Sequence, residues 1–369
     1  MRGMKVLVAG AGPAGLYFSY LLKRHDPRCE VRVVEQNPPD ATFGFGVVFS
    51  DRALEFLRAD DPTTYDLITP ELEAWVDLVV VHRGVRTVID GIGFNAIGRL
   101  HFLRFMRQQA ESVGITVEFE KGIVSKQEIQ GYDLVVAADG ANSTVRRSAD
   151  FGTRITHCTN KFAWYGTPRR FEKLTQTFLE NEHGNFNVHH YPHGGGMSTF
   201  VVECDAATWQ RAGFEKMPEA ETKAYLERVY APVLQGSPLV SNKSIWRNFP
   251  NVRNERWFAG NVVLIGDALR TAHFSIGSGT RLAMEDAIAL TKALRAEGDI
   301  PRALASFEAA RRPIVDKLVA AADASGAWYD RFPEHMKLAP REFAWSYIQR
   351  SGRIDPARLR KTSPRFVDG

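Results

Sequence analysis

Apolar runs alternate with segments of helical spacing in the first and last thirds of the chain. Residues 4–9 form one such run, broken only by Lys5, and a helix through residue 23 follows it directly. A short apolar run bounded by a turn is typical of a strand buried in a parallel sheet. Further strands are predicted at 30–35, 132–138 and 262–265, and helical spacing recurs at 99–110, 283–294 and 303–328. The pattern predicts an α/β protein with a Rossmann-like parallel sheet and long C-terminal helices.

The middle of the chain changes to β-rich segments separated by turns. Two of them, at 76–82 and 85–89, flank Arg83-Gly84 and predict a hairpin. Four more strands and a helix are predicted at 162–166, 175–179, 185–190, 197–203 and 219–230. Short strands in close succession favour a mostly antiparallel β-sheet domain, inserted into the parallel-sheet domain.

Because the β-rich segments interrupt the parallel-sheet domain, both expected domains are discontinuous in sequence. We expect the parallel-sheet domain to comprise residues 1–74, 97–158 and 259–330, and the β-sheet domain, which would hold a substrate, to comprise 75–96 and 159–258. Residues 331–369 are basic and contain prolines, and we expect them to wrap the surface as a C-terminal tail.

Three glycines, Gly10, Gly12 and Gly15, stand where the first strand turns into the first helix. In a nucleotide-binding turn, the first glycine permits the tight turn, the second the approach of a pyrophosphate, and the third close packing of helix on strand. Glu35 ends the next strand, where a carboxylate commonly binds a ribose. The pattern predicts a dinucleotide site, with a glycine-rich turn of another α/β domain as the alternative. The triplet alone does not separate FAD from NAD.

Composition narrows the function classes further. The 369 residues are 44% hydrophobic and 24% charged, with a net charge of +4 and no block of Lys and Arg, so we expect no nucleic-acid partner. The three cysteines lack metal-ligand spacing, and no metal is expected. No apolar run has the length of a membrane span, and the first strand leaves no room for a signal peptide, so a cytoplasmic protein without membrane contact is expected.

Two more turns, each directly after a predicted strand, contain a glycine and an acid. Asp139-Gly140 follows the strand at 132–138, and Gly266-Asp267 follows the strand at 262–265, with Gly277 and Gly279 opening the next helix. The ordered combination of glycine triplet, DG turn and GD turn resembles the single-component FAD-dependent aromatic hydroxylases, over essentially the whole chain. The resemblance implies a p-hydroxybenzoate hydroxylase-like fold, FAD as cofactor, and NADH and O2 as co-substrates.

The resemblance also assigns residues to FAD. Those expected to contact it are Gly10, Gly12, Ala14 and Gly15 at the pyrophosphate, Glu35 at the adenosine ribose, Arg99 near the pyrophosphate and ribityl chain, Asp139 and Gly140 with Arg146 at the DG turn, Asp267 at the ribityl chain, and Gly277 and Gly279 at the flavin edge. Ordinary turn acids and surface arginines are the alternatives. Glu285 and Asp286 are expected to be first-turn helix acids.

Phe274 stands where the family usually has proline. This departure, with segments such as Trp246-Arg247-Asn248-Phe249 and Arg350-Ser351-Gly352-Arg353-Ile354, resembles a branch that includes the aryl-CoA hydroxylases. The branch implies an aromatic acyl-CoA substrate, with 5-hydroxylation of salicylyl-CoA to gentisyl-CoA as the nearest example. A free phenolic or indole substrate, or a flavin-binding redox protein without hydroxylation, stay as alternatives. The oligomeric state is left open.

Substrate residues are expected on the strand around 187–193. Alternate residues of a strand share a face, so His189 and Tyr191 would point together and His190 would point away. His189, Tyr191 and His273 are the candidate catalytic residues, and Tyr165, Trp246 and Phe274 are the candidate aromatic walls, with packing of the sheet as the alternative for each. Possible contacts for CoA phosphates are Arg169, Arg170, Lys173 and Arg247, with a solvated charged face as the alternative.

Overall fold

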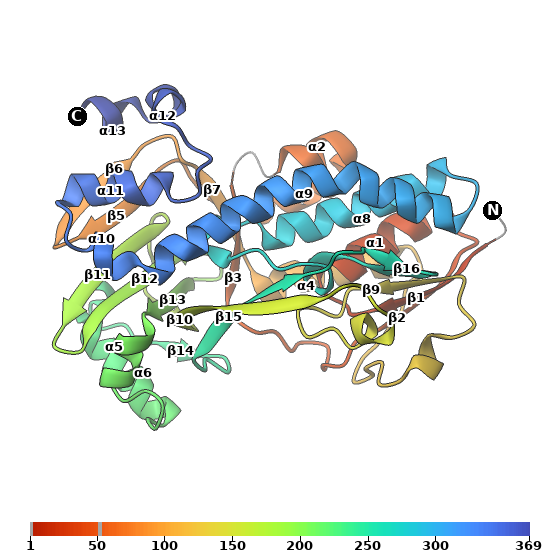
Figure 1. Ribbon diagram of the computed structural model, residues 1–369, viewed down its shortest axis with the longest axis horizontal. Helices are drawn as coiled ribbons and strands as arrows, with labels where there is room; N and C mark the ends of the chain where they lie inside the picture. Colours follow the sequence, from red (N-terminus) through yellow and green to blue (C-terminus); the bar gives the residue numbers. More distant parts are fainter. Residues whose placement is uncertain (1–2, 51–53) are drawn as a thin grey trace.

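The computed structural model of the chain describes residues 3–50 and 54–369, and its first sheet is the expected parallel one (Figure 1). Its strands run in the order β16-β17-β9-β1-β2-β8, and every neighbouring pair is parallel except β16 with β17. The strands are β1 (Lys5–Ala9), β2 (Glu30–Val34), β8 (Val117–Glu118), β9 (Leu134–Ala137), β16 (Phe258–Ala259) and β17 (Val262–Leu264). The carboxyl ends of β1, β9 and β17 therefore lie side by side, so the three turns singled out in the sequence meet at one edge.

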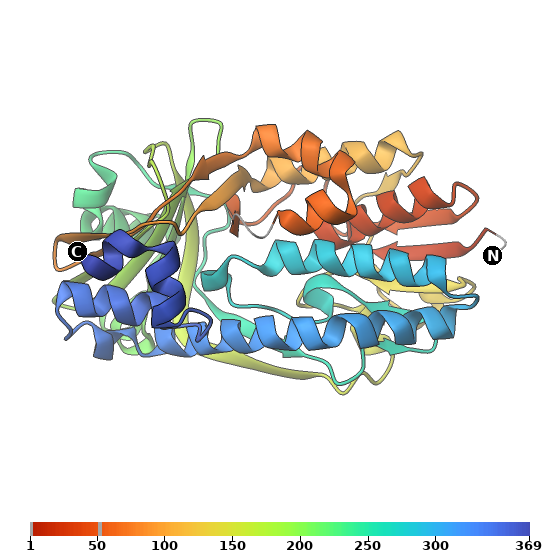
Figure 2. The same ribbon diagram turned by 90° about the horizontal axis from the view of Figure 1, so that it is seen from above.

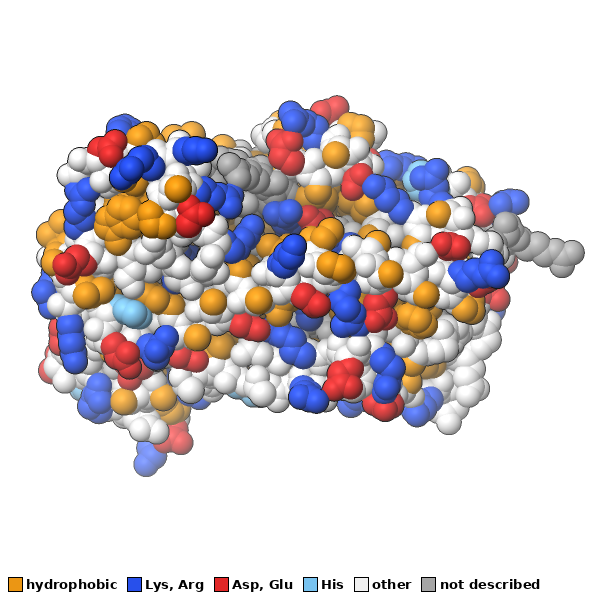
Figure 3. All heavy atoms as spheres, turned by 45° about the horizontal axis from the view of Figure 1, so that its top comes forward, with side chains coloured by type: hydrophobic (Ala, Val, Ile, Leu, Met, Phe, Trp, Pro, Cys, Tyr) orange, Lys and Arg blue, Asp and Glu red, His pale blue; other side chains and the backbone are white. Residues whose placement is uncertain are grey.

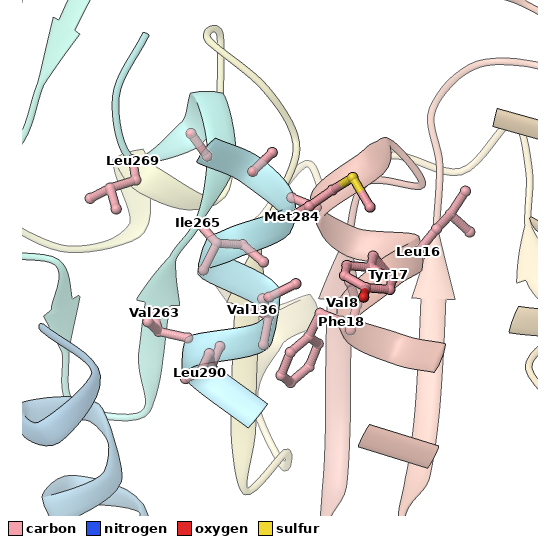
Figure 4. Close-up of a cluster of buried hydrophobic side chains, with 14 of the residues drawn as sticks. Val8, Leu16, Tyr17, Phe18, Val136, Val263, Ile265, Leu269, Met284 and Leu290 are labelled. Carbon is pink, nitrogen blue, oxygen red and sulfur yellow. The ribbon is translucent and has the colours of Figure 1, made fainter. Parts of the chain in front are cut away.

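Two helices bury the sheet around these strand ends. Helix α1 (Pro13–His25) and helix α8 (Gly279–Ala296) pack on each other and on the sheet, and α4 (Arg99–Ser112) packs beside α1. Figure 4 shows the apolar side chains that fill the contact, with Tyr17 and Phe18 from α1 facing Met284 and Leu290 from α8. Fully burying side chains of this size stabilises the fold by roughly 1.5–3 kcal/mol each, so the strand ends are held rigidly.

The second sheet is mostly antiparallel and carries the predicted strands. Its order is β14-β10-β13-β12-β11-β5-β6, with β15 also paired to β10, and only β11 with β5 is parallel. The strands are β5 (Leu78–His82), β6 (Val85–Ile89), β10 (Arg154–Thr167), β11 (Thr175–Asn181), β12 (Gly184–Pro192), β13 (Ser198–Cys204), β14 (Val240–Ser241) and β15 (Arg247–Arg253). Helices α5 (Ala206–Arg211), α6 (Glu219–Val229) and α7 (Ala231–Leu234) follow β13. The α/β fold class is thereby confirmed.

A three-stranded sheet and one long helix join the two larger sheets. The small sheet has the order β3-β7-β4, from β3 (Gly46–Ser50), β4 (Glu73–Trp75) and β7 (Phe94–Gly98), with α2 (Glu55–Asp60) and α3 (Pro62–Ile68) between β3 and β4. Helix α9 (Ile300–Asp330) runs beside α8 and continues along β10 to the second sheet (Figure 2). A single 31-residue helix therefore braces both parts of the molecule.

Residues 331–369, expected as a surface tail, instead form four helices (Figure 2). They are α10 (Phe332–His335), α11 (Pro340–Gln349), α12 (Pro356–Thr362) and α13 (Pro364–Asp368). Helix α11 packs on β5 and β6, and α13 packs on β6. Phe343, Tyr347 and Leu359 are fully buried in a core with Phe178 of β11. The helical spacing of these apolar side chains explains the packing. Within the described part of the chain, no helix combines the length and apolarity needed to cross a bilayer.

Candidate active site

A cavity of about 540 Å³ links the edge of the parallel sheet to the second sheet and to the C-terminal helices. Its lining includes residues from both ends of the described chain, from Gly12 to Thr362. Of the residues expected to contact FAD, Gly12, Ala14, Arg99, Gly140, Asp267, Gly277 and Gly279 line it. The structure therefore brings the three turns to one cavity. The expected cofactor residues that do not line it are Gly10, Gly15, Glu35, Asp139 and Arg146.

The three glycines of the first turn have distinct surroundings. A Cβ on Gly10, whose φ is 100°, would lie 2.3 Å from the carbonyl oxygen of Ala138, and a Cβ on Gly15 would lie 2.0 Å from the carbonyl oxygen of Gly10. A Cβ on Gly12 would meet no described atom within 4 Å, because it would point into open space at the N-terminus of α1. Gly10 and Gly15 thus permit close packing, whereas Gly12 leaves room where helix amides suit a pyrophosphate.

Glu35 closes the loop beside this turn. Its Oε2 accepts a hydrogen bond from the Ala11 amide at 2.9 Å, and its Oε1 accepts from the amide and side chain of Asn37 at 2.9 and 2.7 Å. Glu35 does not line the cavity, and its contact with a ribose stays a prediction. What the structure shows is a carboxylate that fixes the loop between β1 and α1.

The DG and GD turns are tied together by Arg146, which is buried. Its guanidinium donates to the carbonyl oxygens of Ala268 and Ala141 at 2.8 and 2.6 Å. Asp139 accepts hydrogen bonds from the amides of Thr144 and Val145 at 2.8 and 3.2 Å, so its carboxylate orders the chain after the DG turn. Arg146 is therefore no surface arginine, and Asp139 acts on the backbone of its own turn.

Asp267 and Arg99 line the cavity and have opposite charges. Asp267 is exposed to the cavity, whose walls remove part of its hydration and raise the pKa of its carboxyl, although the nearby cations of Arg270 and Arg99 oppose that shift. Burial lowers the pKa of Arg99, and Asp267 opposes this shift in turn. Arg99 donates from Nε to Thr42 at 3.1 Å, and its terminal nitrogens bond no other described residue. A carboxylate and free guanidinium donors beside an open glycine turn fit the hydroxyls and phosphates of FAD.

A buried ion cluster behind the GD turn departs from the expectation for Glu285 and Asp286. Asp286 is fully buried and bonds Arg270 through both oxygens, at 2.6 and 3.0 Å, while it also accepts from the Gly266 amide at 3.0 Å. Arg311 of α9 lies 2.9 Å from Glu285 and 3.4 Å from Asp286. These acids are structural anchors in the interior of α8, and they fix the GD turn to α8 and α9.

The far end of the cavity is aromatic. Phe274 lines it with Phe162 and Phe249, whose ring centroids lie 4.9 and 5.9 Å from that of Phe274. His273 lies behind Phe274 at 4.4 Å between ring centroids and does not line the cavity; its Nδ1 bonds the Ser275 hydroxyl at 2.8 Å. The structure therefore assigns Phe274 to the wall of the cavity and His273 to its support.

The placement of Tyr165 and Trp246 corrects two expected walls. Both lie outside this cavity: Tyr165 is fully buried in the core on the other side of β10, and Trp246 packs on Phe214 at 4.8 Å between ring centroids. Successive side chains of a strand point to opposite faces. Because Phe162 and Trp164 of β10 line the cavity, Tyr165 must point away from it.

His189 and Tyr191 of β12 both line the cavity, as their shared face requires, whereas His190 packs on Phe171 with ring centroids 4.0 Å apart. The Tyr191 hydroxyl donates to the carbonyl oxygen of Gly46 at 3.0 Å, and burial raises its pKa, so it stays a neutral phenol. Burial lowers the pKa of His189 to about 3, which keeps its imidazole neutral.

A buried polar network continues from His189. The Tyr329 hydroxyl donates to Gln176 Oε1 at 3.2 Å, and Gln176 Nε2 lies 3.0 Å from His189 Nδ1. The amide nitrogen can only donate, so this arrangement assigns the imidazole proton to Nε2. Nε2 lies 3.6 Å from Oε2 of Glu203, which also accepts through Oε1 from Asn160 at 2.9 Å. Burial raises the pKa of Glu203 to about 7.

Sequence reasoning missed Glu203 and Gln176. The sequence predicts a strand at 197–203 that ends at Glu203, and the single acid in this largely apolar run was the available signal. An acid with no solvent access must have polar partners, because an isolated buried carboxylate costs several kcal/mol.

We expect Glu203→Gln to remove a pH dependence of stability. The folded pKa of about 7 exceeds the ordinary 4.5, so the folded state holds the proton more tightly and the free energy of unfolding falls as pH rises from 4.5 through 7. The loss amounts to about 3 kcal/mol by pH 8. Urea unfolding at pH 4.5, 6, 7 and 8 should show that the variant gains on the parent chain as pH rises. Glu180→Gln, at an exposed position of β11, is the matched control, and a parallel pH dependence in parent and Glu203→Gln would contradict the assignment.

Residues of the C-terminal helices complete the cavity. Tyr347, Arg350, Arg353 and Arg358 line it, whereas Arg169, Arg170, Lys173 and Arg247, considered for CoA phosphates, do not. Lys173 instead pairs with Asp77 at 3.4 Å, and Arg247 lies over the ring of Phe43. Sequence reasoning expected a surface tail here and so could not place these arginines.

Comparisons with known proteins agree with this geometry. A family model described as an FAD binding domain matches residues 125–322. Salicyloyl-CoA 5-hydroxylase of a Streptomyces species is 40% identical over 99% of this chain and 73% of its own length. The 3-hydroxy-4-methyl-anthranilyl-[aryl-carrier protein] 5-monooxygenase of Streptosporangium sibiricum is 39% identical over 90% of each chain. The structure of 2-methyl-3-hydroxypyridine-5-carboxylic acid oxygenase matches with a TM-score of 0.72 at 16% identity, over 98% of this chain and 96% of that one, which supports the fold.

Proposed function

Because this chain belongs to the family of FAD-dependent aromatic monooxygenases, we propose that it hydroxylates the ring of an aromatic acyl-CoA, converting salicylyl-CoA to gentisyl-CoA. The observation that carries the proposal is the lining of the cavity, which combines the glycine cradle, a cluster of phenylalanine rings and residues of the C-terminal helices. We assign the aryl group to the aromatic end and the thioester chain to the side lined by the C-terminal helices. The name and coverage of the Streptomyces relative support the same substrate class.

The overall reaction balances with one O2 and one NADH. The substrate, O2, NADH and a proton give the hydroxylated thioester, NAD⁺ and water. When bound, FAD supplies the redox chemistry that passes electrons from NADH to O2 and one oxygen atom to the ring. Gly12, Arg99 and Asp267 would hold it, together with the amides at the start of α8. NADH and CoA thioesters are metabolites of the cytoplasm, where we place the activity.

The protein's own side chains position the ring. Phe162, Phe249 and Phe274 pack against the aryl group and exclude water, which strengthens polar interactions inside. His189 lies at the cavity as a neutral imidazole, with Nδ1 held by the Gln176 amide and Nε2 3.6 Å from Glu203. Because both of its nitrogens are engaged, His189 orients the ring as a polar part of the cavity wall and does not accept the phenol proton.

The test compares salicylyl-CoA with free salicylate in air. We expect the flavin-loaded protein to oxidise NADH at least 10-fold faster with the thioester, and mass spectrometry should find a product with one added oxygen. NADPH in place of NADH measures coenzyme preference, and protein stripped of flavin is the control. Faster oxidation and hydroxylation with free salicylate alone would replace the thioester by a free phenolic acid. Flavin binding with no stimulation by either compound would contradict the proposal.

A further inference from the structure

Three arginines gather where the cavity opens beside the C-terminal helices. Arg281 lies on α8, Arg353 follows α11, and Arg358 lies on α12, and all three line the cavity. Figure 3 shows the molecule hollowed between the C-terminal helices and α8, with Lys and Arg side chains around the hollow. The cavity therefore changes from an aromatic chamber inside to a basic border at its opening.

The charges of this cluster are poorly neutralised within the protein. Among the described residues, neither Arg353 nor Arg358 forms an ion pair with a carboxylate. Arg281 bonds Glu285 at 2.8 Å, but Glu285 also lies 2.9 Å from Arg311. Partial burial lowers the pKa of Arg353, and the cations of Arg281 and Arg358 lower it further. Like charges held this close are costly unless an anion joins them.

The segment that carries the cluster is held in place before any ligand arrives. Arg350 stacks its guanidinium over the ring of Tyr347, 3.9 Å from its centroid, and donates to the carbonyl oxygen of Ser275 at 2.8 Å. Ser275 belongs to the turn that also carries Phe274, so the basic border is fixed to the wall of the aromatic chamber. Groups held in advance lose less conformational freedom on binding.

The loop after β6 closes the opposite wall. Gly91 and Gly93 line the cavity, and a Cβ on Gly91 would lie 1.9 Å from the carbonyl oxygen of Thr362 in α12. Asp90 accepts from the Phe366 amide of α13 at 2.8 Å. This loop therefore fixes the helix that carries Arg358 beside the cavity.

We propose that Arg281, Arg353 and Arg358 bind the phosphate groups of the CoA arm while the aryl group occupies the chamber. Guanidinium groups match phosphate oxygens in geometry and charge, and several around one opening select a polyanionic chain over a neutral one. The inference rests on the proposed function and adds the location of the CoA site. It replaces the basic residues on the second sheet that the sequence suggested.

The test uses two thioesters that share the aryl group. Salicylyl-CoA carries the phosphates, whereas salicylyl-pantetheine lacks them. We expect the parent protein to have a KM for salicylyl-CoA about 10- to 100-fold below that for salicylyl-pantetheine, since each lost charged hydrogen bond weakens binding about tenfold or more. The double variant Arg353→Gln/Arg358→Gln should raise the KM for salicylyl-CoA to nearly that for salicylyl-pantetheine, with less than about twofold change in kcat.

Matched controls distinguish failure of the arginine site from failure of the proposed function. Arg360→Gln, exposed on α12 and outside the cavity lining, should leave the preference for CoA intact, and thermal unfolding checks that the double variant folds. Added NaCl should raise the KM for salicylyl-CoA in the parent alone. If both thioesters are hydroxylated with equal KM values, or the preference survives the double variant, the arginine site is wrong and the proposed function stands. If neither thioester is turned over or bound, both fail.

Discussion

The Asp286→Ala variant should lose about 3–5 kcal/mol of its free energy of unfolding, because the substitution leaves the buried charge of Arg270 without its partner. Asp286 is fully buried, bonds Arg270 through both oxygens and accepts the Gly266 amide, so its removal also frees the GD turn. Equilibrium unfolding in urea measures the loss, and flavin absorbance measures the effect on the turn. We expect the free energy of unfolding and the amount of bound flavin to fall together.

Lys292 on the same helix provides the control. Its ion pair with Asp60 is exposed, so Lys292→Ala should cost less than about 1 kcal/mol. Equal losses for the two variants would show that the Asp286 cluster is no more important to the fold than a surface ion pair. The double variant Arg270→Met/Asp286→Leu offers a further comparison, because removing both charges should recover part of the loss.

The Gly12→Val variant should fold but lose FAD, with a dissociation constant raised at least about 100-fold. Gly12 has φ −77° and ψ −177°, a conformation that valine adopts freely, and a Cβ at this position would meet no described atom within 4 Å. The added methyl groups would occupy the space where a pyrophosphate meets the amides of α1. Flavin content after purification and fluorescence titration of the flavin-free protein with FAD measure the effect.

Variants at two other glycines distinguish a blocked pyrophosphate site from a general loss of stability. Gly298→Val changes an exposed loop after α8, outside the cavity, and should leave FAD content unchanged. Gly15→Ala should instead lower stability, because its Cβ would lie 2.0 Å from the Gly10 carbonyl oxygen. Normal FAD content in Gly12→Val would contradict the position that we assign to the pyrophosphate.

The parallel sheet and its turns could be predicted because their signals are local. Each of the three strands is an apolar run, and glycines follow it directly, accompanied by an acid at Asp139-Gly140 and Gly266-Asp267. Strand topology then brings these turns to one edge without further information. The same reasoning placed His189 and Tyr191 on one face, which the structure shows lining the cavity.

Of the expected aromatic walls, Phe274 lines the cavity, whereas the wall formed by β10 could not be predicted because both faces of that strand are apolar. Phe162 and Trp164 alternate with Ala163 and Tyr165, so the hydrophobic pattern does not say which face meets the cavity. Tyr165 was the wrong choice for that reason. Only the packing of α6 and α7 against the other face, which buries Tyr165 beside Leu226 and Leu234, decides the question.

Polar contacts between residues far apart in the chain also could not be predicted from the sequence. Glu203 bonds Asn160, and Tyr329 bonds Gln176, across 43 and 153 residues of chain. Arg270 and Asp286 are nearer, but their pairing depends on how α8 packs against the GD turn. The basic, proline-bearing composition of 331–369 concealed helices whose apolar faces become evident only opposite β5 and β6.

The participation of residues 350–362 in the cavity has a consequence for synthesis of the chain. Ribosomes add about 5–20 residues per second, so roughly 17–70 seconds separate Gly12 from the arginines that share its cavity. Late in that interval, once α8 has been synthesised, the nascent chain holds a cradle for a cofactor beside a chamber that lacks its outer wall. Contacts between segments so distant in the chain also slow folding. A fusion partner or pause site that delays docking of α11 and α12 should therefore lower the yield of active protein without changing the flavin-binding sequence.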